Sequence, residues 1–319
     1  MKILITGIGG FVGTNLAPYL AGHMVYGLDL EDVGTPGVVR TFSWDDFKRD
    51  ALPPVDAIVH LAGKAHATGK PWEAAEYFQV NRDLTVHVFD YFRTHNIAKF
   101  VFFSTVKAAA EEVSGLLTEE AAPAPVGPYG ESKLAAERYI LGCLRDDPAR
   151  FADREVCIFR PCMIHGPGNK GNLNLLFTVV SRGIPWPLGA YDNRRTFTSV
   201  ENMCFAVKSV LEQSIPSGIY NMCDDEALST NEIIEVIGSV LGRKIPVWRL
   251  PRPLIAAAAR VGGWLHLPLN PERLRKLTEN YIASNVKIKA ALGIRALPVR
   301  ARDGLVHTIE SFKKEGVTA

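Results

Sequence analysis

The chain has 319 residues, of which 47% are hydrophobic and 22% charged, with a formal net charge of +2. This composition is ordinary for a soluble globular protein of one large or two modest domains. The near balance of charges excludes a strongly basic surface, so we expect no nucleic-acid partner.

The cysteines and the apolar segments favour a cytoplasmic protein without a membrane span. The five cysteines include no C-x-x-C pair, so we expect reduced, buried thiols and no metal site. We expect no signal peptide, because residues 2–6 already read as part of the fold. The most apolar stretch, 254–267, is too short to span a bilayer and contains Arg260. We expect a core or lid helix there, with a peripheral membrane contact as the alternative.

The first element predicted along the chain is a buried strand over 2–6, followed by a glycine turn. Gly7, Gly10 and Gly13 have the spacing G-x-x-G-x-x-G, and the apolar positions that follow have helical spacing. Glycines allow a tight strand-to-helix turn and let a pyrophosphate approach backbone N–H groups. The N-terminus of the helix then offers unpaired N–H donors to the phosphates.

A second strand, over 24–28, ends at Asp29. An acid about 20 residues after the glycine turn is placed to accept hydrogen bonds from an adenosine ribose. Its negative charge would repel an additional 2′-phosphate, so the sequence favours NAD as the cofactor. The order of strand, turn, helix, strand and acid predicts a dinucleotide-binding unit.

Strands and helices continue to alternate in the first half of the chain, and this predicts a doubly wound, Rossmann-like parallel sheet. The later segments predict a smaller, mostly helical substrate-binding lobe. We assign 1–166 and about 195–224 to the NAD-binding domain, about 167–194 and 225–300 to the lobe, and 301–319 to a C-terminal helix. Strands are expected at 56–60, 99–103, 155–160, 195–200 and 218–223, and helices at 73–96, 129–144, within 171–189, from 229, and at 253–264, 271–277 and 302–315.

A Y-x-x-x-K pair lies on the helix predicted over 129–144. The spacing of four places Tyr129 and Lys133 on one face of the helix, one turn apart. A phenol is a weak base at neutral pH, but a neighbouring ammonium favours the phenolate. Tyr129 could then remove a proton from a substrate hydroxyl. Ser104 and Thr105 follow the strand over 99–103, at the edge of the sheet where ligands bind.

These motifs resemble the extended short-chain dehydrogenase/reductase family, in particular its NAD-dependent epimerase/dehydratase group. The similarity covers nearly the whole chain: T-G-x-x-G-x-x-G, H-L-A-G, S-T and Y-x-x-x-K occur in the family's order. The segment 160–168 is similar to the family's R-P-x-x-x-x-G-P-G loop, and 195–200 to its R-D-[FY]-x-x-V segment. The resemblance implies an enzyme that acts on a nucleotide sugar, with a UDP-linked sugar expected.

The resemblance also implies roles for individual residues. The catalytic set is Thr105, Tyr129 and Lys133. The NAD-binding set is Gly7, Gly10, Phe11, Val12, Gly13, Asp29, Leu30, Leu61, Ala62, Gly63, Asn81, Ser104, Tyr129, Lys133 and Pro161. The substrate-binding set is Lys64, Thr105, Lys107, Asn172, Leu173 and Arg195, where the arginine would contact the nucleotide phosphates.

One departure from the family pattern bears on the reaction. Dehydratases of the family usually follow the catalytic threonine with Asp-Glu, whereas Val106 and Lys107 follow it here. The leading hypothesis is therefore an NAD-dependent 4-epimerase of UDP-hexoses or UDP-N-acetylhexosamines, serving the synthesis of surface polysaccharides. A reductase of a 4-keto-6-deoxy nucleotide sugar is the alternative, and a non-catalytic nucleotide-binding protein is a third hypothesis.

The sequence leaves the assembly and the substrate carrier open. Family members often pair through two helices, which would be 73–96 and 129–144 here, so a homodimer is expected; a monomer is the alternative. A lipid-linked sugar stays open as the substrate because of the apolar stretch 254–267.

Overall fold

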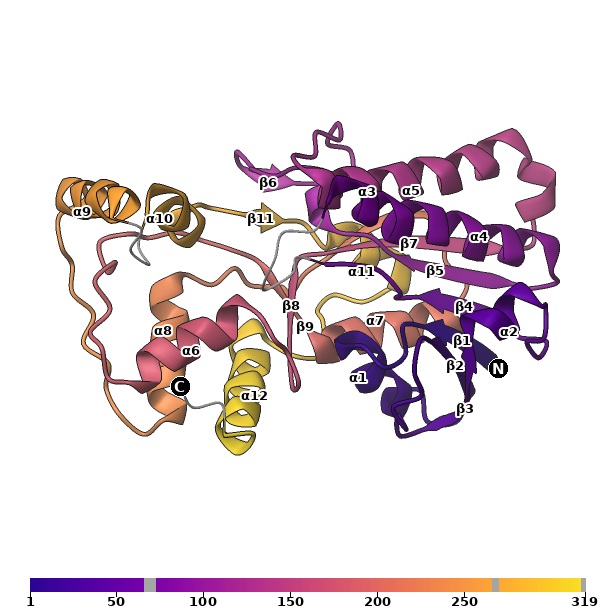
Figure 1. Ribbon diagram of the computed structural model, residues 1–319, viewed down its shortest axis with the longest axis horizontal. Coiled ribbons are helices and arrows are strands. Elements are labelled where there is room, and N and C mark those ends of the chain that lie inside the picture. The colour runs from indigo at the N-terminus through magenta and orange to yellow at the C-terminus, as the bar shows by residue number, and fades with distance from the viewer. Residues whose placement is uncertain (66–72, 266–269, 317–319) are drawn as a thin grey trace.

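Seven parallel strands form the central sheet of the computed structural model, which describes residues 1–65, 73–265 and 270–316 (Figure 1). Their order across the sheet is β3-β2-β1-β4-β5-β7-β10. The strands are β1 (Lys2–Thr6), β2 (Met24–Asp29), β3 (Val38–Ser43), β4 (Ala57–His60), β5 (Lys99–Phe103), β7 (Glu155–Pro161) and β10 (Gly218–Met222). The order reverses between β1 and β4, so the carboxyl ends of these two strands define the switch point where ligands bind in such sheets.

Alternating side chains of each strand supply the two faces of the sheet. Ile3 and Ile5 face the layer that contains α1 (Phe11–Tyr19), α7 (Val200–Glu212) and α11 (Val286–Leu292). Leu4 lies in the opposite core, with α4 (Leu84–Thr94) and α5 (Pro128–Asp146). Figure 1 shows α4 and α5 on one side of the sheet and α1 and α7 on the other. The predicted doubly wound fold is confirmed.

A short π-helix interrupts the long helix predicted over 73–96. It spans Phe78–Asp83 and joins α3 (Ala74–Tyr77) to α4. π-Helical turns are rare and often lie at functional sites. Here the turn contains Asn81, which is fully buried and contacts the active-site edge described below.

A second lobe lies at the other end of the molecule from β3 (Figure 1). Its core contains Phe177, Ile234, Ala259 and Ile309, among others. Its helices are α6 (Asn172–Ser181), α8 (Thr230–Val240), α9 (Arg252–Trp264), α10 (Pro271–Thr278) and α12 (Ala301–Lys314). Ser229 caps α8 in a capping box with Glu232, as the predicted helix start at 229 required.

Several small elements were not predicted from the sequence. In the edge strand β3, buried and exposed side chains do not alternate, and Phe42 is the only buried one. Its hydrophobic pattern is therefore too weak to predict a strand. The helix α7 was not predicted either, and the further unpredicted elements include α2 (Trp44–Lys48), β6 (Leu116–Leu117), β8 (Met163–His165), β11 (Ile282–Ala283) and α11. Ile288 and Leu292 of α11 pack in the core beneath the sheet, so this part of the range 225–300 lies with the sheet domain and not with the lobe.

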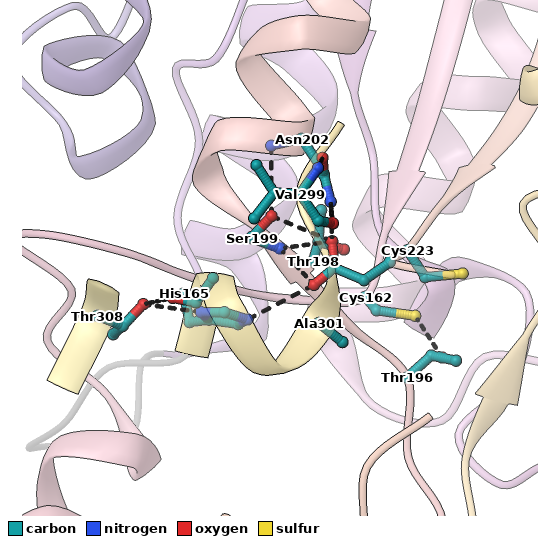
Figure 2. Close-up of polar contacts among 12 residues, drawn as sticks. Cys162, His165, Thr196, Thr198, Ser199, Asn202, Cys223, Val299, Ala301 and Thr308 are labelled. Carbon is teal, nitrogen blue, oxygen red and sulfur yellow. Dashed lines mark hydrogen bonds and ion pairs between the residues drawn. The ribbon is translucent and has the colours of Figure 1, made fainter. Parts of the chain in front are cut away.

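A buried polar cluster ties α12 to the sheet domain (Figure 2). Asp224 accepts hydrogen bonds from the backbone N–H of Ser199 at 3.0 Å and from Asn202 Nδ2 at 2.7 Å. Nε2 of His165 lies 3.7 Å from Asp224 Oδ2, and its Nδ1 lies 2.8 Å from Thr308 Oγ1 on α12. These contacts fix the start of α7 on Asp224 and tie α12 to His165.

Gly13 allows the close contact between α1 and the turn that precedes it. A Cβ at this position would lie 2.4 Å from the carbonyl oxygen of Ile8, closer than any real contact. Gly13→Ala should therefore lower the free energy of unfolding by about 1–3 kcal/mol, because such overpacking moves backbone. Urea unfolding measures the change.

Gly142→Ala is the matched control for this prediction. Gly142 lies within α5, and a Cβ there would have only the distant tip of Arg145 as a neighbour, at 4.0 Å. Alanine is favoured over glycine in helices, so this variant should gain about 0.5–1 kcal/mol. Equal stability of the two variants would contradict the proposed crowding at Gly13.

Candidate active site

A tight glycine turn connects β1 to α1 at the switch point of the sheet. Gly7 has φ +70° and donates its N–H to Leu28 O at 2.8 Å. A Cβ on Gly7 would lie 2.8 Å from the backbone nitrogen of Ala62, in the loop after β4. The backbone therefore passes close to that loop, and α1 begins directly after Gly10 with no side chain capping it. The first N–H groups of α1 are available to a phosphate.

Asp29, at the end of β2, is held in place by the same turn. Its Oδ2 accepts the N–H of Gly9 at 2.8 Å, and its Oδ1 accepts the N–H of Leu30 at 2.7 Å. Each carboxylate oxygen has a further lone pair available for a ribose hydroxyl. Leu30 is 83% exposed beside it.

The loop after β4 is supported by Asn81. The side-chain oxygen of Asn81 accepts the N–H of Lys64 at 2.7 Å, and its Nδ2 donates to Lys64 O at 3.0 Å and to Ser132 Oγ at 3.1 Å. Asn81 is fully buried. Its contribution here is to fix the backbone around Gly63, and a direct contact with the cofactor stays a prediction. A Cβ on Gly63 would lie 2.9 Å from Lys133 Nζ, so the loop runs against α5.

His60, at the end of β4, completes a buried chain of hydrogen bonds under this loop. Thr85 Oγ1 donates to Asn81 O at 2.7 Å, so it can only accept from His60 Nε2, which lies 3.0 Å away. Nδ1 of His60 then accepts from Thr6 Oγ1 at 2.7 Å. Burial, together with the charge of Lys133, lowers the pKa of His60 to about 3. The ring is neutral, with its proton on Nε2.

The structure brings Thr105, Tyr129 and Lys133 together at the carboxyl edge of β5. The side chains of Thr105 and Lys133 are buried and that of Tyr129 is partly exposed, and the hydroxyl of Thr105 interacts with the phenol of Tyr129. Lys133 Nζ donates to Phe103 O at 2.8 Å, which holds the ammonium next to the end of the strand. Pro128 occupies the first turn of α5, where its missing N–H costs nothing.

The electrostatics of this set depend on burial. Burial lowers the pKa of Lys133 from 10.5 to about 8, and the carboxylate of Glu137 opposes that change. Burial raises the pKa of Tyr129, the hydroxyl of Thr105 lowers it, and the neighbouring Tyr77 raises it. Near neutral pH Lys133 is thus charged and close to its titration range, while the phenol holds its proton until a further positive charge arrives.

Glu137 continues the same helical face one turn beyond Lys133. It forms a bidentate pair with Arg160, with Nε to Oε1 at 2.9 Å and Nη2 to Oε2 at 2.5 Å. Both side chains are at most 1% exposed. Ser104 donates its hydroxyl to Glu137 as well. Because that proton is in use, Ser104 can offer only its acceptor lone pairs to a cofactor.

Tyr77, on α3, packs against the ring of Tyr129. The two ring centroids are 6.2 Å apart and the planes are steeply inclined. Tyr77 is only 7% exposed, so it shields the phenol from water on this side. The shielding is consistent with the raised pKa of Tyr129.

The other residues predicted to bind substrate lie outside the predicted catalytic set, and several of them contact the second lobe. Lys107 Nζ is bound to Glu111, with 3.1 Å to Oε1, and lies over the ring of Tyr281. Arg195 donates to Lys276 O at 2.7 Å, at the end of α10. Asn172 is exposed in the first turn of α6, whereas Leu173 next to it is buried in the core of the second lobe. Lys107 and Arg195 would have to exchange these partners in order to bind a ligand.

The sequence prediction missed Glu137, Tyr77 and the hydrogen-bonded chain through His60. Glu137 carries a readable signal, because it follows Tyr129 and Lys133 at the same spacing of four. Tyr77 and His60 carry none, since their roles depend on packing between distant segments. Two further positions of the predicted cofactor set, Phe11 and Val12, begin α1, and Pro161 ends β7.

The glycine turn, the acid at the end of β2 and the tyrosine–lysine pair together define a dinucleotide-dependent enzyme. The cradle fits NAD: side chains are excluded at Gly7, N–H groups are available at the start of α1, and a carboxylate lies at Asp29. Among the residues that the structure describes, no three His, Cys, Asp or Glu side chains are grouped to hold a metal ion.

Comparison with known proteins gives the family. The model of the NAD-dependent epimerase/dehydratase family matches residues 3–223, so the chain belongs to this family, whose members use NAD. It is 29% identical to a UDP-glucose 4-epimerase of Vibrio cholerae over 268 residues, 79% of each chain.

Two further proteins extend the comparison over more of the chain. An N-acetyl-α-D-glucosaminyl-diphospho-ditrans,octacis-undecaprenol 4-epimerase of Escherichia coli O157:H7 is 28% identical over 299 residues, 90% of this chain and 84% of that one. The crystal structure of a UDP-glucuronic acid 4-epimerase from Bacillus cereus in complex with NAD has a TM-score of 0.74, covers 99% of both chains and is 20% identical. That structure confirms the fold over the whole chain.

The neutral, buried state of His60 predicts a pH dependence of stability. Its folded pKa of about 3 lies below the unfolded value of 6.5, so the unfolded state binds more protons between these values. Stability is therefore lost as pH falls below 6.5, by about 2 kcal/mol between pH 8 and pH 5. Urea unfolding of His60→Gln should show a loss smaller by that amount. The control is His87→Gln, at an exposed position of α4; equal pH dependence of His60→Gln and wild type would contradict the prediction.

The buried Glu137–Arg160 pair predicts two separable effects of Glu137→Gln. Removal of one partner leaves a buried guanidinium without its counter-charge, which should cost about 3–5 kcal/mol of unfolding free energy. It also removes the charge that raises the pKa of Lys133, so turnover should be lost at a lower alkaline pH.

A double variant separates these effects. Glu137→Gln combined with Arg160→Met removes the unpaired charge, so stability should largely return while the alkaline limit stays lowered. An alkaline limit equal to that of wild type in both variants would restrict Glu137 to a structural role.

Proposed function

We propose that this protein is an NAD-dependent 4-epimerase of UDP-linked sugars. The observation that carries the proposal is the convergence of Thr105, Tyr129 and Lys133 at the carboxyl edge of β5, next to the glycine turn. The Vibrio relative, named a UDP-glucose 4-epimerase, supports the choice of substrate class.

The proposed reaction begins with removal of a proton from the hydroxyl at sugar carbon 4. Tyr129 accepts this proton as phenolate, and Thr105 holds the reacting oxygen through its hydroxyl. Lys133 favours the phenolate by its charge. Bound NAD supplies a positive charge and a reversible acceptor for the hydride from carbon 4. Tyr129 then returns the proton to the product, so the chain ends each cycle in its starting protonation state.

The residues after Thr105 favour epimerisation over dehydration. Val106 is buried and Lys107 is paired with Glu111, so this segment presents no free acid next to the reacting carbon. Elimination of water requires an acid and a base in addition to Tyr129. The short 3-10 helix Val106–Ala108, capped by Thr105, holds the segment in this form.

A second candidate keeps the chemistry and changes the carrier of the sugar. The Escherichia relative, which matches 90% of this chain, is named for a sugar diphosphate attached to undecaprenol. One structural observation favours this candidate, because α9 exposes apolar side chains at the end of the lobe that would hold the diphosphate. The catalytic residues would act in the same way on either carrier.

A cytoplasmic location and a homodimer complete the proposal. The dimer would pair α4 and α5 with the same helices of a second copy, since these two helices lie side by side on one face of the sheet (Figure 1). Sedimentation velocity tests the dimer.

Tyr129→Phe tests the function. Wild-type protein mixed with UDP-glucose or UDP-N-acetylglucosamine, without added cofactor, should form the carbon-4 epimer, observed by NMR. Tyr129→Phe should lose at least about a hundredfold in turnover, the usual contribution of a general base, and should still bind NAD.

Tyr139→Phe is the matched control, because this phenol lies on the same helix but donates to Asp90. It should keep wild-type turnover. Undiminished turnover of Tyr129→Phe would remove Tyr129 from the mechanism. Consumption of NADPH with a 4-keto sugar, without epimer formation, would favour the reductase instead.

A further inference from the structure

Helix α9 exposes a continuous apolar stripe. Leu254, Val261, Trp264 and Leu265 are 57%, 54%, 80% and 51% exposed, and Ala257 and Ala258 between them are exposed too. These positions recur every three or four residues, so they share one side of the helix. We call this set the α9 stripe. Large apolar side chains gathered on one exposed face indicate an interaction surface.

The fold does not need the α9 stripe. Ile255, Ala259 and Gly262 form a different side of the helix and pack in the lobe core. That side attaches the helix to the lobe, and Arg252 anchors its start by donating to Ala190 O. The helix is therefore apolar both toward the core and toward solvent, an arrangement that burial in this chain does not explain.

The charged residues of the segment 236–271, which contains α9, are all positive. The sequence contains no Asp or Glu between Glu235 and Glu272, whereas it contains Arg243, Lys244, Arg249, Arg252 and Arg260. Arg260 is exposed within the helix itself. On the neighbouring α10, Glu272 is paired with Lys276 at 2.8 Å. An apolar stripe on a segment that carries cations and no acid complements the surface of an anionic bilayer, where apolar side chains enter the acyl boundary and cations meet phosphates.

The position and length of α9 fit this kind of contact. Figure 1 shows α9 at the far end of the molecule, beside α10 and away from the sheet. None of the helices in the described ranges is long and apolar enough to cross a bilayer. Trp264 and exposed Trp248 add the indole rings that favour the interface between lipid and water.

We propose that the α9 stripe binds the surface of a membrane containing anionic phospholipids. The helix lies parallel to the surface, with Leu254, Val261 and Trp264 in the acyl boundary and Arg260 at the level of the phosphates. Helix α10 packs against α9, and its last turn accepts the hydrogen bond from Arg195. Docking thus places the proposed diphosphate site next to the membrane. This agrees with the second candidate under the proposed function, a lipid-linked sugar diphosphate, and the inference rests on that proposal only for the identity of the substrate.

Vesicle flotation with the full chain tests the proposal. Wild type should float with vesicles of phosphatidylcholine containing a quarter phosphatidylglycerol, and less well with phosphatidylcholine alone. Leu254→Ser/Val261→Ser/Trp264→Ser should bind at least about tenfold more weakly, because it removes the buried apolar area. Brominated acyl chains should quench the tryptophan fluorescence of wild type but not that of the triple variant.

Matched variants distinguish binding through α9 from a general effect of surface hydrophobicity or charge. Leu175→Ser/Val179→Ser removes exposed apolar side chains of α6 and should leave flotation unchanged. Arg249→Gln/Arg260→Gln should weaken binding to the anionic vesicles only. Tyr129→Phe should float like wild type, so failure of the proposed reaction is distinguishable from failure of docking.

Two outcomes would overturn the proposal. One is absence of flotation with the anionic vesicles, or equal flotation of wild type and the triple variant. The other is self-association that the triple variant abolishes while vesicles bind neither protein, which would assign the α9 stripe to a second copy of the chain.

Discussion

The buried ion pair between Glu137 and Arg160 is the interaction on which the active site depends. It joins α5 to β7 without access to water, and Ser104 at the end of β5 donates to the same carboxylate. Three elements therefore meet at one charge. A buried pair gains little over apolar packing but fixes geometry, because each partner is costly to leave alone. Tyr129 and Lys133 lie on the same face of α5 as Glu137, so the ion pair also fixes their position.

A second buried cluster of polar side chains fixes the backbone of the loop after β4. His60, Thr6, Thr85 and Asn81 form a chain in which each proton has one acceptor. The chain supports the loop that closes over the glycine turn. Both clusters are buried and lie next to the residues proposed to act on the ligand.

The fold was predictable from the sequence because its signals are local. The apolar strands, the glycine turn and the Y-x-x-x-K helix can each be recognised from a few neighbouring residues, and the structure confirms these predictions. The edge strand β3 could not be predicted, since its single buried residue, Phe42, gives no alternation of apolar and polar residues. The partners of Arg195 and Asn81 were equally hidden, because their contacts with Lys276 and Ser132 join segments far apart in the sequence. Helix α11 illustrates the same limit: its residues pack under the sheet, although its neighbours in sequence belong to the lobe.

The position of α11 has a consequence for how the chain reaches its native state on the ribosome. The apolar underside of β10 stays uncovered until residues 286–292 have been made, after most of the second lobe. The sheet domain cannot finish folding first and wait for its lobe, so both mature in one late event. A nascent chain that stops near residue 224 would expose Tyr220 and Met222 to the solvent and to chaperones that bind apolar surface.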